Sequence, residues 1–349
     1  MYLLAIDLFF ILEKLILIAL VITLSMIVAM YATYGERKVA AFMQDRIGPN
    51  RAGPFGLLQP LADGGKLFFK EEIIPLASSK FLFVLGPVLA MITALLTSAV
   101  IPWGSPLEIS GRKVPLQVAD INIGILYVFG VVSLGVYGIM IGGWASNNKF
   151  SLLAAIRGAS QMVSYELAMG MALIAVLMLT GSLQMSTIVE NQLQNGWNII
   201  YQPLGFFIFF ICALAECNRT PFDLPEAENE LNFGYHQEYS SMKLGFYLFA
   251  EYINMFISGV IMATLYFGGY DIPFVNEATW GISPNLLAFI SFIVLFLKAI
   301  FFVFVFMWIR WTIPRFRYDQ LMHLGWKRLV PLALLNMLIT AAVVLWLNK

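Results

Sequence analysis

Acidic side chains stand at positions in this sequence where a charge is costly. Glu166 lies in QMVSYELAMG and Glu251 in YLFAEYINM, both inside long apolar runs, and Glu216 closes a third such run. Charged groups in a membrane span face protein or water, and they are functional candidates by default. Burial disfavours the charged form of a carboxyl group, so these groups can exchange protons near neutral pH. A structural hydrogen bond or an ion pair, for example to Lys298, is the alternative interpretation.

The segment that follows the third run is also acidic. It reads AECNRTPFDLPEAENELNFGYHQEY, and with the residues up to Lys243 it sets Arg219 and Lys243 against six acids: Glu216, Asp223, Glu226, Glu228, Glu230 and Glu238. Asp223 and Glu226 have the spacing of a capping box at a helix start. Glu226 and Glu230 would then share one helical face, where like charges repel unless protons are shared or bases approach. A solvated acidic loop is the alternative interpretation.

An earlier segment carries the opposite charge. GERKVAAFMQDRIGPNRAGPFGLLQPLADGGKLFFKEE is too long and too apolar for a plain connection between two helices. Pro60 can open a short helix with one apolar face, a type of element that lies at a membrane boundary. Arg37, Arg46 and Arg51 are mixed with Gly and Pro, which fits a rigid wall with fixed positive charge. Composition alone favours the alternative interpretation, in which the arginines anchor the segment on the cytoplasmic side.

The elements that must position these residues are membrane helices. The 349 residues are 60% hydrophobic and 12% charged, whereas about a quarter of the residues of a soluble domain are charged. A bilayer core requires about 20 mainly apolar residues per helix, and the runs are continuously apolar, unlike the alternating strands of a barrel. We therefore expect an all-α integral membrane protein, a single polytopic domain over residues 1–349. Its eight expected spans are 15–34, 81–101, 121–143, 160–181, 199–215, 244–268, 285–309 and 329–347.

The distribution of Lys and Arg predicts the orientation. Sixteen of the 21 basic residues fall in four connections that we expect in the cytoplasm: 35–80, 144–159, 216–243 and 310–328. Both termini are then outside. Asp7 and Glu13 stand where a signal peptide would be basic, so we expect the first helix to be retained.

Residues that hold redox groups are scarce. Cys212 and Cys217 cannot supply the four ligands of an iron–sulfur cluster, and they are most simply small hydrophobic residues. His236 and His323 fall in loops, not paired on helices as a membrane haem requires. The sequence contains no phosphate-binding loop and no strand-borne GxGxxG. We expect no metal and no redox cofactor in this chain, so electrons must come from partners.

Five long motifs resemble one family. They are GERKVAAFMQDRIGPNRAGPFGLLQPLADGGKLFFKE, GGWASNNKFSLLAAIRGASQMVSYE, AECNRTPFDLPEAENEL, AEYIN and WIRWTIPRFRYDQLMHLGWK. In this order they are similar to the signatures of the H subunit of bacterial NADH-quinone oxidoreductase, which is subunit 1 of mitochondrial complex I. The resemblance runs from about residue 35 to residue 330. Gly64-Gly65 and Asn229 depart from the usual pattern without removing a charged position.

The resemblance implies a membrane subunit of a proton-translocating enzyme in the bacterial inner membrane. Such a subunit forms a quinone chamber with hydrophilic-arm subunits, while FMN and iron–sulfur clusters belong to partner subunits. It also borders small membrane subunits and antiporter-like subunits. The matched chamber residues are Arg37, Arg46 and Asp63. The matched chain of proton- or charge-carrying acids is Glu36, Glu166, Glu216, Glu226, Glu228 and Glu251.

Three other functions compete with this one. A related subunit of a membrane-bound hydrogenase or formate hydrogenlyase would not copurify with NADH-oxidising subunits. A secondary transporter would work alone and would transport in liposomes. A passive anchor for a soluble enzyme would tolerate neutralisation of Glu166 and Glu251.

Overall fold

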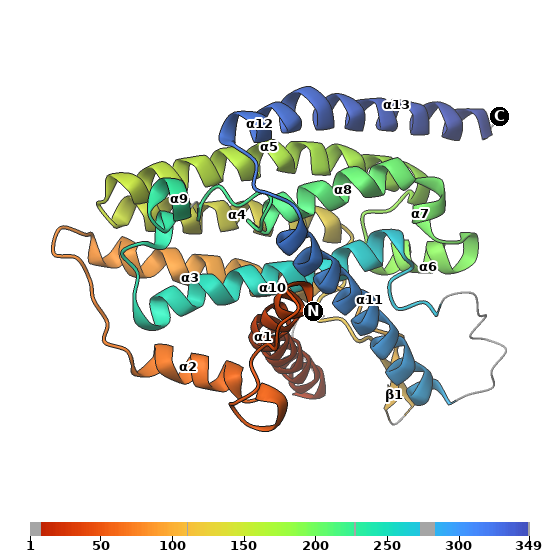
Figure 1. Ribbon diagram of the computed structural model, residues 1–349. Coiled ribbons are helices and arrows are strands. Elements are labelled where there is room, and N and C mark those ends of the chain that lie inside the picture. Colours follow the sequence, from red (N-terminus) through yellow and green to blue (C-terminus); the bar gives the residue numbers. More distant parts are fainter. Residues whose placement is uncertain (1–7, 110, 227, 273–282, 348–349) are drawn as a thin grey trace, which may run out of the picture.

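The computed structural model describes residues 8–109, 111–226, 228–272 and 283–347, which are mostly helical (Figure 1). Within these ranges, seven helical runs are long and apolar enough to cross a membrane. They are α1 (Leu8–Met43), α3 (Lys80–Leu96) with η2 (Thr97–Val100), α4 (Gly124–Ala145), α5 (Lys149–Thr180), α10 (Ser241–Tyr266), α11 (Pro284–Thr312), and α12 (Tyr318–Leu324) continued by η5 (Gly325–Leu329) and α13 (Val330–Leu347).

The eighth expected span is a shorter helix. It is α8 (Pro203–Glu216), which follows α6 (Met185–Asn195) and α7 (Asn198–Tyr201). At 1.5 Å per residue, its 14 residues extend about 21 Å, less than the roughly 30 Å of a bilayer core. A helix of this length that starts at one membrane boundary ends before the other, so it leaves Glu216 at membrane depth. The predicted all-α fold with about eight spans is confirmed.

Helix α5 begins well before its predicted start. Asn148 caps it by accepting a hydrogen bond of 3.0 Å from the backbone N–H two residues later, and Gly181 ends it with a left-handed φ of 69°. Most of the connection expected at 144–159 is therefore helical. Glu166 lies at the middle of the helix instead of near its beginning, because the amphipathic first turns carry too little apolar sequence to be recognised as a span.

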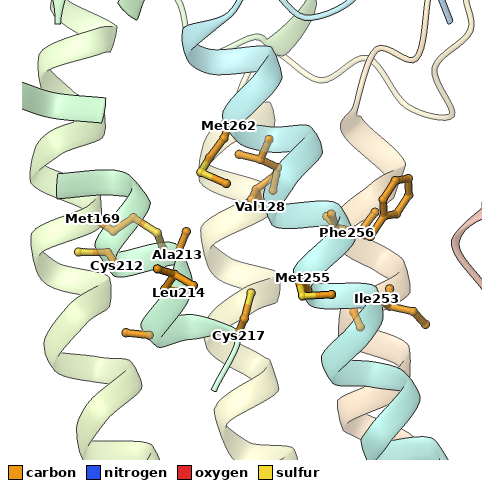
Figure 2. Packing of buried hydrophobic residues seen from close by; sticks show 14 of the residues in the cluster. Val128, Met169, Cys212, Ala213, Leu214, Cys217, Ile253, Met255, Phe256 and Met262 are labelled. Atoms are coloured by element: carbon orange, nitrogen blue, oxygen red, sulfur yellow. The ribbon is translucent and has the colours of Figure 1, made fainter. Parts of the chain in front are cut away.

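The long helices pack around a core of small and apolar side chains. Helix α4 lies between α3 and α5, α10 contacts α3, α1 and α11, and α13 covers α5 and α8 (Figure 1). Figure 2 shows Cys212 and Cys217 among Val128, Met169 and Met255 in this core. Both cysteines are free and buried, as expected for small hydrophobic residues.

Short elements occupy the connections. Helix α2 (Gln59–Phe69) has Pro60 in its first turn as predicted, follows η1 (Pro54–Gly56), and lies against α1 and α10 (Figure 1). Phe68 and Phe69 of α2 remain exposed. The strands β1 (Leu107–Ile109) and β2 (Arg112–Val114) form an antiparallel hairpin, with Leu107 opposite Val114.

The helix start predicted at Asp223 is wrong. Residues 224–226 form a turn, and α9 (Glu228–Leu231) is a single helical turn, followed by η3 (Gly234–His236). The Asp223 carboxylate lies 2.8 Å from Arg315 Nη2 instead of capping a helix. An ion pair with a residue 92 positions later replaces the local capping interaction. Because Glu226 lies in the turn before α9, it shares no helical face with Glu230.

Candidate functional site

A buried arginine joins two of the predicted acids. Only 4% of Arg219 is exposed, and it follows α8 in the acidic segment. Its Nη1 lies 3.9 Å from Glu36 Oε2 on α1, and its Nη2 lies 3.4 Å from Glu251 Oε2 on α10. The guanidinium also stacks over the Tyr252 ring, 4.1 Å from its centroid. The two carboxylates and the aromatic face together compensate a cation that would otherwise be very costly to bury.

Glu36 has further partners on the same side of the cluster. Arg310 Nη1 of α11 lies 2.7 Å from Glu36 Oε1, and the Tyr252 hydroxyl donates a hydrogen bond of 2.8 Å to Oε2. This carboxylate therefore links α1, α10, α11 and the acidic segment. We call Glu36, Arg219, Glu251 and Arg310 the ionic cluster.

Glu251 also belongs to a pair of hydrogen-bonded carboxyl groups. Its side chain is hydrogen-bonded to Glu226, which requires one proton between the two groups. Burial disfavours the charged form of Glu226, but the cations Arg219 and Arg310 lower the pKa of this carboxyl. The Tyr235 hydroxyl donates to Glu251 Oε1 over 3.2 Å. The pair can thus hold or release a proton beside a fixed positive charge.

A small cavity lined by both polar and apolar side chains lies between Glu251 and Glu216. Its volume is about 60 Å³, enough for a few water molecules. Among the described residues, Glu216 Oε2 has no hydrogen-bond partner, so ordered water is its natural partner. The other polar side chains around this cavity are Thr93, Thr97, Asn218, Tyr235, Tyr247, Asn254 and Ser258.

A larger cavity opens on the other side of the ionic cluster, between α1, α2, α10 and α11. Its volume is about 530 Å³. Arg37 and Asp63 stand on its wall, joined by a 2.6 Å ion pair between α1 and α2, and Gln59 donates to the second oxygen of Asp63 over 3.2 Å. Its apolar wall includes Met30, Pro60, Leu67, Leu244, Leu248, Phe249 and Trp311. The cavity therefore offers apolar walls that end at Glu36, Arg219 and Arg310.

Two other predicted site residues, Arg46 and Glu166, lie away from the ionic cluster. Arg46 is exposed, its Nε donates to Gln44 over 2.7 Å, and it does not line the large cavity. Glu166 accepts a hydrogen bond from Ser133 of α4 and lines an open groove between α4 and α5. The side chain of Glu228 lies outside the described residues. Roles for these three residues stay predictions.

Arg219 is the central residue that sequence reasoning did not select. It is the one basic residue in AECNRTPFDLPEAENE, where it offsets only part of the acidic charge. The available signal was a single arginine, directly after an apolar span, surrounded by more acids than it can pair with. Lys298, proposed as a partner for the membrane acids, instead donates to the carbonyls of Phe267, Gly269 and Asp271 at 2.7–2.9 Å.

Comparison with known proteins decides the family. Residues 15–341 match the family described as NADH dehydrogenase. The chain belongs to this family. A Cytophaga hutchinsonii protein named as an H subunit of NADH-quinone oxidoreductase is 64% identical over 336 residues, covering 96% of this chain and 98% of that protein. Proteins with the same name from Flavobacterium johnsoniae (61% identical, 96% of each chain) and Geobacter metallireducens (50% identical, 94% and 95%) are similar along almost their whole lengths.

The resemblance predicted from the five motifs is therefore confirmed, and with it the assignment to the NADH-quinone oxidoreductase subunits. Membership of the NADH dehydrogenase family agrees with the multi-pass helical fold. Within the described residues, no group of three or more His, Cys, Asp or Glu side chains could hold a metal ion.

Proposed function

We propose that this chain forms the quinone chamber of an NADH:quinone oxidoreductase and couples quinone reduction to proton translocation. The observation that carries the proposal is the large cavity, whose apolar walls end at the ionic cluster. A quinone has a polar ring on a long apolar tail, so its path requires apolar walls and a few polar groups near the ring. The 530 Å³ cavity has both.

The ionic cluster supplies the coupling chemistry. Reduction of a quinone to the quinol takes up two electrons and two protons, and it changes the charge beside Glu36 and Arg219. The proton shared by Glu226 and Glu251 responds to that charge, because interacting acids titrate as a group. Water filling the small cavity would connect Glu251 with Glu216, since both carboxyl groups line it. Glu166, on the neighbouring helix α5, and Glu228 would extend the relay beyond the ionic cluster.

Partner subunits would complete the enzyme complex. We propose that they hold the FMN and the iron–sulfur clusters that deliver electrons. They would also cover the exposed first connection, where Arg46 would become part of the chamber wall. Ile47, Phe55 and Phe69 of this connection are 79–87% exposed, which supports an interface at this surface.

The chain would lie in the bacterial inner membrane with both termini outside. Contacts between its basic connections support a common side for them: Lys243 pairs with Glu72, and the Phe316 N–H donates to the Pro221 carbonyl over 3.2 Å. With Arg315 paired to Asp223, the first, third and fourth predicted cytoplasmic connections are joined to one another.

This orientation predicts a labelling pattern. Cysteines introduced at Leu76 and Arg317, which are well exposed, should react with a membrane-impermeant maleimide only from the cytoplasmic side. A cysteine at Ile109 in the β1–β2 hairpin is the opposite-side control, and the native cysteines are buried. Labelling of Leu76→Cys or Arg317→Cys in intact cells from outside would reverse the orientation.

The cavity wall predicts a selective loss of quinone reduction. Arg37→Met or Asp63→Asn should lower quinone-dependent NADH oxidation several-fold, because the pair fixes α2 on the cavity. Stability should change by less than about 1 kcal/mol, since Arg37 is half-exposed. NADH oxidation by an artificial acceptor should continue, because the electron-input sites lie elsewhere.

The matched control for this test is Arg317→Met, which breaks the exposed pair with Asp319 away from the cavity. Both activities should be normal in this variant. An equal fall of both activities in fully assembled Arg37→Met complex would contradict a role at the quinone cavity.

A further inference from the structure

One buried titratable side chain has no part in the proposed relay. His236 is 1% exposed, at the end of η3. Neither Nδ1 nor Nε2 has a hydrogen-bond partner among the residues that the structure describes. A buried polar group without a partner is rare and costs free energy. The imidazole nitrogens therefore need an explanation beyond packing.

Packing alone does not require an imidazole at this position. The rings of Phe233 and Tyr235 meet His236 edge-on, with centroids 4.4 Å and 4.7 Å away. A phenylalanine could make both contacts. Phe233 lines the large cavity, whereas Tyr235 lines the small cavity and donates to Glu251. His236 thus lies between one residue from each cavity.

The backbone holds His236 beside the carboxyl pair. Gly234 has a left-handed φ of 73°, and a Cβ there would lie 1.9 Å from the Pro225 carbonyl oxygen. The Tyr235 N–H also donates to that oxygen over 3.3 Å. The turn that carries His236 is therefore pressed directly onto the backbone that carries Glu226.

Burial and neighbouring charge act in opposite directions on the protonation of the His236 imidazole. Burial lowers the pKa of His236, while Glu226 opposes the shift, so the ring is neutral near pH 7. From α10, the titratable groups near this turn are Glu251 and Tyr247, whose ring meets that of Tyr235 edge-on. Of the other helices packed on η3, α5 carries Arg157, engaged by Glu230, and α4 has no charged residue.

We propose that His236 is a proton-carrying residue that exchanges a proton with Glu226 through ordered water, a step that rests on the proposed function. When the proton shared by the carboxyl pair lies on Glu226, its O–H bond breaks, water passes the proton, and an N–H bond forms on the imidazole. The products are a carboxylate and an imidazolium, and no electrons are transferred. The reverse step returns the proton, so His236 stores it between the two cavities.

The test compares His236→Phe and His236→Gln with His323→Phe in the intact complex in native membranes. His323 is the second histidine of the chain and is exposed on α12, which makes it the matched control. Both His236 variants should lower coupled proton translocation at least about tenfold, as expected for loss of a proton-transfer group. They should also alter the pH profile of quinone reduction, while His323→Phe should alter neither quantity.

Two outcomes overturn the proposal. Normal translocation with either His236→Gln or His236→Phe would mean that the imidazole only packs or only donates a hydrogen bond. Glu251→Gln, measured in parallel, distinguishes a failure of the inference about His236 from a failure of the proposed carboxylate relay. If Glu251→Gln lowers translocation and the His236 variants do not, the inference about His236 alone fails. If none of the three variants lowers it, the proposed relay fails as well.

Discussion

Arg219→Met should prevent stable assembly of the chain. The substitution would leave the buried carboxylate of Glu251 without its cation, while Glu36 would keep only Arg310. Removing one partner from a buried ion pair costs about 3–5 kcal/mol, because the remaining charge is uncompensated. The measurement is the amount of intact complex in the membrane, together with its thermal inactivation.

Arg157→Met is the control for this prediction. Arg157 pairs with Glu230 at 2.7 Å, but both side chains are substantially exposed, so the loss should be below about 1 kcal/mol. A double variant, Arg219→Met with Glu251→Gln, should recover part of the lost complex because it removes one uncompensated charge. Normal assembly of the single Arg219→Met variant would show that the ionic cluster is not what holds these segments together.

Glu216→Gln and Glu251→Gln should each lower quinone-coupled turnover and proton translocation at least about tenfold. Assembly should largely be kept, because Arg219 retains Glu36 and the Tyr252 ring when Glu251 is neutralised. Both residues border the small cavity, and glutamine keeps their size and polarity without carrying a proton. The measurements are electron transfer to quinone and protons translocated per electron in proteoliposomes. Glu230→Gln, at the exposed pair, should behave as the native protein.

The two substitutions should also be non-additive. If Glu216 and Glu251 act in one relay through the same water-sized cavity, the double variant should lose little more than the worse single variant. Glu166→Gln belongs in the same series, since the sequence predicts it as a relay member. Full translocation per electron in the assembled single and double variants would show that these acids are structural.

The membrane acids were predictable because their cost is visible in the sequence. Glu166 and Glu251 interrupt apolar runs, and such positions are compatible with few roles. Their partners were not predictable, because the ionic cluster joins α1, α10, α11 and the acidic segment, which are far apart in the sequence. Tyr252, for example, donates to a carboxylate 216 positions away.

The helix start predicted at Asp223 was wrong because a residue distant in the sequence binds its side chain. The spacing of Asp223 and Glu226 fits a capping box, yet Arg315 pairs with the first acid and Arg219 is among the charges that stabilise the second. Burial and Glu226 raise the pKa of Asp223 to about 7, although Arg315 counteracts them.

The start of helix α5 was predicted too late because Lys149 and Arg157 made its first turns resemble a loop. Continuous apolar sequence identifies the part of a helix that crosses lipid, not the whole helix.

The most direct test of the central claim is a map of the intact complex with a quinone or a quinone-site inhibitor bound. We predict ligand density in the cavity between α1, α2 and α10, with the apolar tail along Leu248 and Phe249 and the ring toward Glu36 and Arg219. Density for a lipid or a partner side chain that fills this cavity, with the quinone bound entirely elsewhere, would contradict the account.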